Sequence, residues 1–116
     1  MAPFKEEDGD WVRFRSLPRN KEEDFHHFEK RDPSIISYEG AMDDVRERAL
    51  AVLRSAQQER LLYVIFRHGE STSRPGKTTA RSVVRGLMRC PEATPFICRS
   101  KCIQHPTVFV AAIRAT

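Results

Sequence analysis

The pattern of apolar and polar residues along the chain predicts strands that alternate with helices. The strongest signal is the run from Leu61 to Phe66, which is apolar throughout and is typical of a strand covered on both faces. After a polar loop, residues 77–89 return to helical period. The apolar positions of that segment fall on one face and the basic ones on another; the basic ones are Lys77, Arg81, Arg85 and Arg89. The middle of the chain is therefore predicted to be strand, loop and helix.

Similar patterns flank this segment. Residues 34–39 predict a short strand that ends at Gly40, and residues 41–58 predict a helix with an apolar stripe. Further strands are expected at 93–99 and 107–113. The connection between these two is too short for a helical crossover, so they should pair antiparallel. The predicted fold class is α/β: a two-layer β-α-β-α-β-β sandwich with a four-stranded mixed sheet and two helices.

The first third of the chain reads differently from the rest. Residues 1–33 are densely charged with scattered aromatic side chains, and we interpret them as an N-terminal arm or extension. Residues 10–17 predict a short strand or an arm across the domain, and residues 21–30 a short helix that docks through Phe25 and Phe28. Asp32-Pro33 marks the boundary, so that residues 34–116 form the α/β domain.

Charge divides the chain into an acidic and a basic half. Residues 1–59 hold 10 Lys and Arg against 14 Asp and Glu, a balance of −4, whereas residues 60–116 hold 10 against 2, a balance of +8. Together they give the net charge of +4. A basic half favours nucleic acid, anionic lipid or an acidic protein as partner. A solvated, dipolar surface without a partner is the alternative.

Other features exclude several classes of protein. No apolar run approaches the ~18 residues that span a bilayer, and the acidic N-terminus is unlike a signal peptide, so we expect a cytoplasmic protein with no membrane partner. Cys90, Cys98, Cys102 and His105 have the spacing C-x7-C-x3-C-x2-H, which matches no common zinc site. The odd number of cysteines favours idle thiols in a reducing compartment. We expect neither a metal nor a cofactor.

The loop after the central strand holds the candidate chemistry. His68 follows the carboxyl end of that strand, where open α/β sheets bind ligands. Its imidazole is suited to accept a proton when neutral or to pair with a phosphate when charged. Glu39 is expected at the same end of the sheet, where it would orient His68. Glycines that allow close backbone approach, hydroxyl groups and cations complete the predicted phosphate-binding set: Arg67, Gly69, Ser71, Thr72, Arg74, Gly76, Lys77, Thr78, Arg81 and Arg85.

Two further interpretations of this loop stay open. In the simpler one, Thr78 or Thr79 only caps the helix and His68 bonds to a neighbouring loop. In the other, residues 71–78 approach the phosphate-binding pattern G-x-x-x-x-G-K-[ST]. Ser71 stands in place of the first glycine, and no later apolar strand ends in an Asp that would hold Mg²⁺. The near-match therefore favours phosphate binding over nucleotide hydrolysis.

The order of elements and two short motifs resemble the Smr (small MutS-related) domain family. In that family a first strand ends in D-L-H-G or a similar motif, and a later strand ends in H-G-x-G ahead of a helix. Here residues 36–42, I-S-Y-E-G-A-M, stand at the first motif with only Gly40 kept, and residues 66–72, F-R-H-G-E-S-T, stand at the second with His68 and Gly69 kept. The resemblance implies nucleic-acid binding, with endonuclease activity in several members of the family.

Two classes of function are therefore expected from the sequence. One is an Smr-like domain that binds DNA or RNA, and that cleaves it if His68 and Glu39 act together. The other is a non-catalytic protein-interaction module that docks an acidic partner through the arm or the basic helix. Nucleic-acid binding should weaken steeply with salt because phosphate contacts release counterions.

Overall fold

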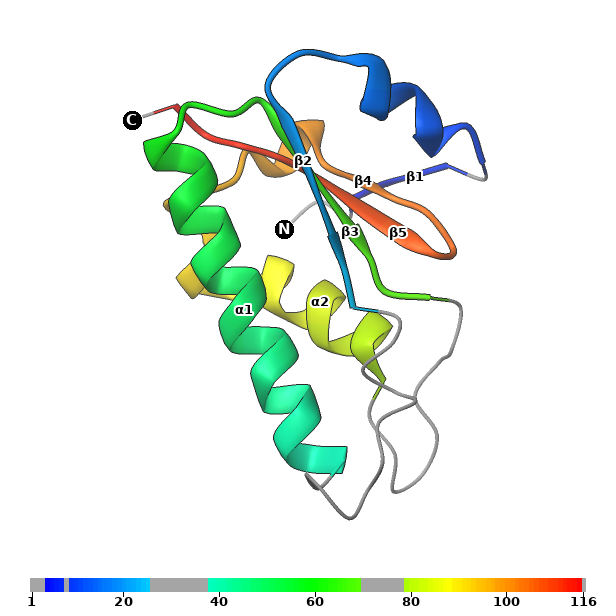
Figure 1. Cartoon of the computed structure of the whole chain (residues 1–116), viewed down its shortest axis with the longest axis vertical. Coiled ribbons are helices and arrows are strands. Elements are labelled where there is room, and N and C mark those ends of the chain that lie inside the picture. The colour runs from blue at the N-terminus through cyan, green and yellow to red at the C-terminus, as the bar shows by residue number, and fades with distance from the viewer. Residues whose placement is uncertain (1–3, 8, 26–37, 70–78, 116) are drawn as a thin grey trace.

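The computed structural model of the chain describes residues 4–7, 9–25, 38–69 and 79–115, with side chains of the first helix described from Met42 onward. These residues form an α/β fold in which one mixed five-stranded sheet carries two main helices (Figure 1). None of the helices in the described part of the chain has the length and apolar composition of a membrane-spanning segment.

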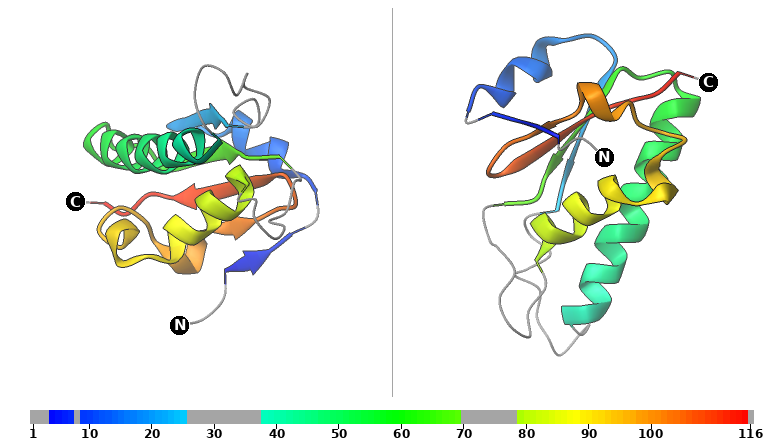
Figure 2. Two further views of the ribbon diagram at one scale, coloured as in Figure 1. Left: turned by 90° about the horizontal axis from the view of Figure 1, so that it is seen from below. Right: turned by 180° about the vertical axis from the view of Figure 1, so that it is seen from behind.

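The sheet has the strand order β1-β4-β5-β3-β2. Figure 2 (left) shows the strands of this sheet side by side when the molecule is seen from below. Both edge strands pair parallel to their neighbours, whereas β5 pairs antiparallel to β4 and to β3. The strands span the following ranges: β1 Lys5–Glu6, β2 Asn20–Asp24, β3 Tyr63–Arg67, β4 Ile103–Gln104 and β5 Val108–Ala112.

The two faces of the sheet are covered unequally. Helices α1 (Tyr38–Gln58) and α2 (Ala80–Arg89) pack on one face, over Val64, Phe66 and Phe109. The other face is covered by the 3-10 helix η1 (Trp11–Ser16), whose Phe14 packs against Ile65 and Val110. Because side chains alternate between the faces of a strand, the side chains of β3 point alternately toward the two helices and toward η1.

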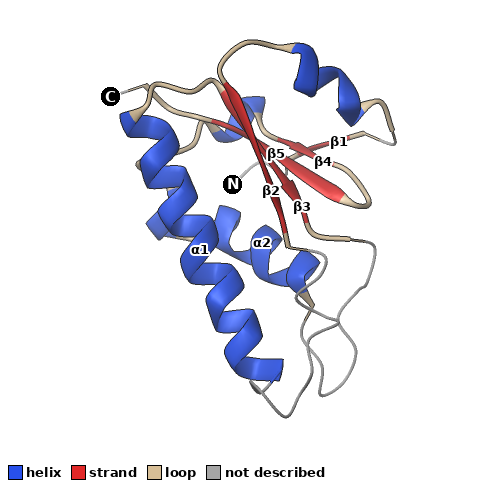
Figure 3. Ribbon diagram, in the orientation of Figure 1, coloured by secondary structure: helices blue, strands red, loops and turns tan. Residues whose placement is uncertain are grey.

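Two of the predicted strands and both predicted helices are confirmed (Figure 3). Residues 63–66 of the apolar run at 61–66 lie in β3, the predicted helices correspond to α1 and α2, and residues 108–112 of the last apolar run form β5. The fold is α/β as expected, with one strand more than the predicted four. Three of the five strands lie where no strand was predicted: β1 and β2 in the N-terminal region, and β4 in the segment predicted as a connection.

The prediction of a helix at 21–30 is wrong for the part that the structure describes, because residues 20–24 form the edge strand β2. The charged sequence of this strand is held by ion pairs to distant residues: Glu22 to Arg15 and Arg67, and Glu23 to Arg48. Charged side chains are common on edge strands because they discourage pairing with other chains. Phe25 docks as expected: it is fully buried and stacks on Phe66 at 5.9 Å.

Residues 10–17 were expected to form either a short strand or an arm across the domain, and the structure agrees with the second expectation. Trp11–Ser16 form the 3-10 helix η1, not a strand, and lie as an arm across one face of the sheet. With β1 and β2, the described residues of the N-terminal region therefore add two strands and a cover to the sheet.

The predicted strand at 34–39 is wrong at Tyr38 and Glu39, which lie in α1; residues 34–37 are outside the described residues. The parallel pair that was expected to flank the first helix exists, but its first strand is β2. Gly40, the residue kept from the first family motif, lies within α1 and does not end a strand.

The predicted strand at 93–99 is also wrong. Pro91–Ala93 and Arg99–Lys101 form short 3-10 helices, and Ile97 contributes a single antiparallel bridge to Ile113. Proline has no backbone N–H for a strand ladder, and Pro91 and Pro95 both fall in this region. The antiparallel partner of β5 is instead β4, which lies in the segment predicted as a connection.

Candidate anion-binding surface

The carboxyl end of β3 leads directly into His68 and Gly69. The backbone N–H groups of both residues donate to the carbonyl oxygen of Thr107, each at 3.1 Å, which ties this end of β3 to the start of β5. Gly69 has φ +87°, a left-handed conformation that glycine adopts without steric cost. Gly69 is therefore required by the backbone turn itself.

The ring of His68 is fully buried, and it lies close enough to Arg81 and Arg85 of α2 for their charges to act on it. Its Nδ1–H donates to the carbonyl oxygen of Gly69 at 2.7 Å, and its Nε2 has no hydrogen-bond partner among the described residues. Burial lowers the pKa of His68 to about 4, and the nearby charges of Arg85 and Arg81 act in the same direction. At neutral pH the imidazole is therefore uncharged, so in this position it does not pair with a phosphate as a cation.

Helix α2 begins with a capping box. The Thr79 hydroxyl accepts from the backbone N–H of Ser82 at 3.3 Å, and the Ser82 hydroxyl accepts from the N–H of Thr79 at 3.2 Å. Such a cap satisfies backbone donors at the first turn of a helix. The simpler interpretation, a threonine that caps the helix, is confirmed for Thr79; Thr78 is outside the described residues.

The basic residues of α2 lie along one face of the helix. Arg85 donates from Nη2 to the carbonyl oxygen of His105 at 3.0 Å, and Arg89 donates from Nη2 to Oε1 of Gln104 at 3.2 Å. Burial lowers the pKa of Arg85, and the charge of Arg81 adds to this effect. The spacing of four residues therefore brings like charges together beside the fully buried His68.

A pocket of about 280 Å³ opens beside these arginines. Arg81 and Arg85 line it together with residues from β1, β4 and the turns that follow them: Glu6, Glu7, Gln104, His105 and Pro106. His105 is buried there with Nε2 3.7 Å from Oε1 of Glu7, and burial lowers its pKa. This side of the pocket could not be predicted from the sequence, because β1 and β4 pair across almost the whole length of the chain and no local pattern indicates that pairing.

The predicted site is only partly assembled by the described residues. His68, Gly69, Arg81 and Arg85 lie at one end of the sheet, but Arg67 belongs to the opposite face, where it pairs with Glu22 at 3.4 Å and Asp24 at 3.5 Å. The remaining loop residues are outside the described residues: Ser71, Thr72, Arg74, Gly76, Lys77 and Thr78. Glu39 lies in α1 with its side chain not described, so its pairing with His68 stays a prediction.

The three cysteines and His105 do not gather into a metal site. Among the described residues there is no group of three or more His, Cys, Asp or Glu side chains placed to hold a metal ion. Cys102 is buried, and all three cysteines have free thiols.

Comparison with models of protein families, with curated proteins and with solved structures finds no match to this chain. The resemblance to the Smr family therefore depends on the motif around His68 and on the order of the elements, and it stays a prediction.

Proposed function

We propose that this protein binds nucleic acid through the cationic face of α2, formed by Arg81, Arg85 and Arg89. The observation that carries the proposal is the crowding of like charge on this face. Arg81 and Arg85 line one pocket at this face. Burial lowers the pKa of Arg85, and the charges of Arg81 and Arg89 act in the same direction. A bound polyanion would relieve this repulsion.

The dimensions of this face fit a chain of phosphates. Arg81 and Arg89 are eight residues apart, which corresponds to about 12 Å along a helix at 1.5 Å per residue. One strand of a duplex carries a charge about every 3.4 Å along its axis, so the row faces several phosphates at once. The charge of Glu6 acts on Arg85 in the opposite direction, and Oε1 of Glu6 accepts a bond from Gln104 at 3.4 Å.

The experiment is a salt titration of binding to labelled RNA and DNA oligonucleotides of equal length. If two or three phosphates are contacted, the logarithm of the association constant should fall with the logarithm of salt concentration at a slope of about −2 to −3 for duplex DNA. Arg81→Gln should reduce the steepness of that slope by about 1. Arg54→Gln, on the exposed side of α1, removes the same charge elsewhere and should leave the slope unchanged.

Competition with polyglutamate separates this proposal from docking of an acidic protein. If polyglutamate displaces the oligonucleotide as well as unlabelled RNA does at equal charge, the surface has no preference for nucleic acid and the proposal fails. An equal effect of Arg81→Gln and Arg54→Gln on the slope would also contradict it, because the binding surface would then not lie on α2.

Cleavage is a separate step and stays a prediction from the family resemblance. The ring of His68 is neutral at pH 7 and has no exposed surface, so a substrate atom reaches it only if its surroundings move. The same oligonucleotides, followed for cleavage by wild type and by His68→Asn, test this step. A role in proton transfer requires that the variant lose cleavage and keep binding.

A further inference from the structure

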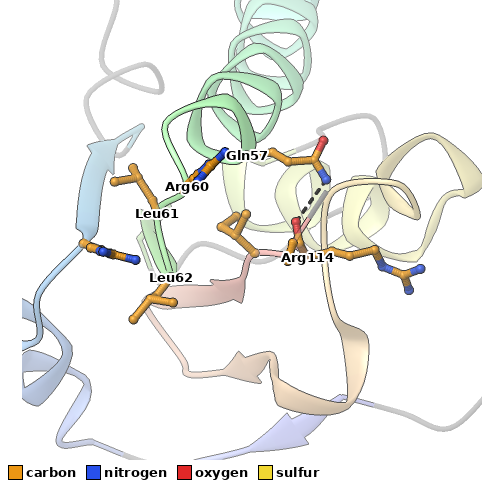
Figure 4. A pocket seen from close by; sticks show the side chains of 8 residues that line it. Gln57, Arg60, Leu61, Leu62 and Arg114 are labelled. Atoms are coloured by element: carbon orange, nitrogen blue, oxygen red, sulfur yellow. Dashed lines mark hydrogen bonds between the residues drawn. The ribbon is translucent and has the colours of Figure 1, made fainter.

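A second pocket lies at the opposite end of β3, where α1 ends and the strand begins (Figure 4). Its volume is about 380 Å³. Apolar side chains form part of its wall: Leu61, Leu62 and Ile113. Leu62 is 46% exposed, so an apolar group entering the pocket finds an apolar surface that the fold itself leaves uncovered.

The charged side chains around this pocket are all cationic. Arg19, Arg60 and Arg114 line it, and no acidic residue lines it among the residues that the structure describes. The guanidinium groups of Arg19 and Arg60 have neither an ion pair nor a hydrogen bond with any described residue. Arg114 is anchored, because its Nε donates to the carbonyl oxygen of Ile97 at 3.2 Å. Arg19 and Arg60 are therefore the cations available to a ligand.

The backbone at both of these arginines is unusual. Arg60 has φ +60° and Arg19 has φ +57°, in the left-handed region that favours glycine. Arg60 N–H bonds to the carbonyl of Gln57, and Leu61 N–H to that of Ala56. This is a Schellman motif, whose left-handed position is usually glycine. The fold thus places an arginine where its side chain is not needed to end the helix.

The left-handed turn at Arg19 is tied to the same pocket. The carbonyl oxygen of Arg19 accepts from the N–H of Leu62 at 2.7 Å. On the other side, Nε2 of Gln57 donates to the carbonyl oxygens of Pro95 and Arg114, the latter bond drawn as the dashed line in Figure 4. Three separate parts of the chain are thereby held around the pocket before any ligand binds.

We propose that this pocket binds a small organic oxyanion, a carboxylate or phosphate monoester joined to an apolar group. Arg19 and Arg60 hold the charged end, since a guanidinium donates two parallel hydrogen bonds to such oxygens. Leu62 and Ile113 contact the apolar part. This site is separate from the cationic face of α2, because β3 lies between them and its five residues extend over roughly 17 Å.

The experiment follows backbone amide signals of the full chain by NMR during titration with hexanoate, hexyl phosphate, acetate and hexanol at constant pH and ionic strength. Hexanoate or hexyl phosphate should give saturable shifts at Arg60, Leu62 and Ile113, with affinity at least tenfold above that of hexanol and of acetate. The tighter of the two identifies the oxyanion. Equal affinity for hexanol would overturn the proposal, as would the absence of saturation with both anions.

Glycine variants remove each guanidinium and keep the backbone conformation. Arg60→Gly and Arg19→Gly should each weaken binding of the tighter anion at least tenfold, with amide signals outside the pocket unchanged. Asp10→Gly is the matched control, because Asp10 also has a left-handed backbone, φ +59°, and does not line this pocket. Unchanged affinity in both arginine variants, or an equal loss in Asp10→Gly, would overturn the proposal.

Discussion

Arg85 donates a hydrogen bond from Nη2 to the backbone carbonyl oxygen of His105 at 3.0 Å, and this bond ties α2 to the turn between β4 and β5. The Nε of Arg85 is buried and has no hydrogen-bond partner among the described residues. Arg85 therefore belongs to the proposed nucleic-acid surface and also holds the fold together. For this reason Arg81, and not Arg85, is the residue whose substitution tests binding.

We expect Arg85→Met to lower the free energy of unfolding by about 1–2 kcal/mol, because a hydrogen bond between a charged donor and a part-buried carbonyl is lost. Methionine keeps a flexible apolar stem and a good helix propensity. Urea denaturation followed by circular dichroism measures the difference. Lys101→Met is the control: Lys101 is exposed, so its substitution should change the free energy of unfolding by less than about 0.5 kcal/mol. Equal effects of the two substitutions would show that the bond from Arg85 contributes nothing to stability.

The helices and strands that follow from the local pattern of apolar and polar residues were predicted. Those that depend on contacts between distant parts of the chain were not. Val64 and Phe66 are buried in an apolar run that is sufficient to indicate β3, and the four-residue spacing of Arg81 and Arg85 is sufficient to place them on one face of α2. By contrast, β2 has the sequence NKEED, and its strand conformation depends on pairing with β3. No local rule of apolar alternation identifies such a strand.

The same difference between local pattern and long-range contacts applies to the candidate site. That His68 lies at a strand end beside the basic helix could be predicted, because both facts follow from neighbouring residues. That its ring is buried could not, since burial depends on segments distant in the chain, such as the one that holds Thr107, whose carbonyl oxygen accepts from the His68 N–H. Glu6 and Glu7 reach the pocket beside α2 only because the edge strand β1 pairs with β4. This pairing joins the two ends of the chain, which no sequence spacing reveals.

The burial of His68 predicts a loss of stability in mild acid. Its pKa is about 4 in the folded protein and 6.5 as an ordinary histidine, so between these values the unfolded chain binds the proton and the folded one does not. Stability is therefore full above pH 6.5 and falls as the pH drops towards 4. The total loss is about 3 kcal/mol, since each pH unit of this interval contributes about 1.4 kcal/mol.

Urea denaturation at pH 7.5, 6.5, 5.5 and 4.5 measures this decline, and NMR titration of the His68 ring protons measures its pKa directly. The lowered pKa of His105 acts in the same direction, so His68→Gln should reduce the decline and not abolish it. Glu22 has a pKa held below its usual value by Arg15, and its contribution is lost only at lower pH. A ring titration of His68 near 6.5 would show that the imidazole is exposed to water in solution.

The three cysteines should differ in reactivity. Cys102 is fully buried, and burial raises its pKa to about 11, whereas Cys90 and Cys98 are only half-buried. Because the thiolate is the reactive form, we expect Cys102 to be the slowest of the three with a thiol reagent at pH 8. Timed alkylation and mass spectrometry of the peptides measure the three rates. In urea the three rates should converge. In the native protein, the Cys102 thiol lies between the Cys98 carbonyl and the Ala112 N–H. A Cys102 that reacts there as fast as Cys98 would contradict this packing.

Substitution of Arg60 tests whether an arginine at this position of the pocket lowers the stability of the protein. A non-glycine residue in the left-handed region is disfavoured by roughly 1–2 kcal/mol, and replacement by glycine removes this strain. About 0.4–1 kcal/mol of the resulting gain in stability is lost again, because glycine has more conformational freedom in the unfolded chain. Arg60→Gly should therefore raise the free energy of unfolding by about 0.5–1 kcal/mol, while Arg60→Ala, which keeps the strain, should not raise it. Urea denaturation of the two variants beside wild type measures both effects. If Arg60→Gly is instead destabilising, the guanidinium contributes to the fold itself, and the left-handed arginine no longer argues for a ligand in the pocket.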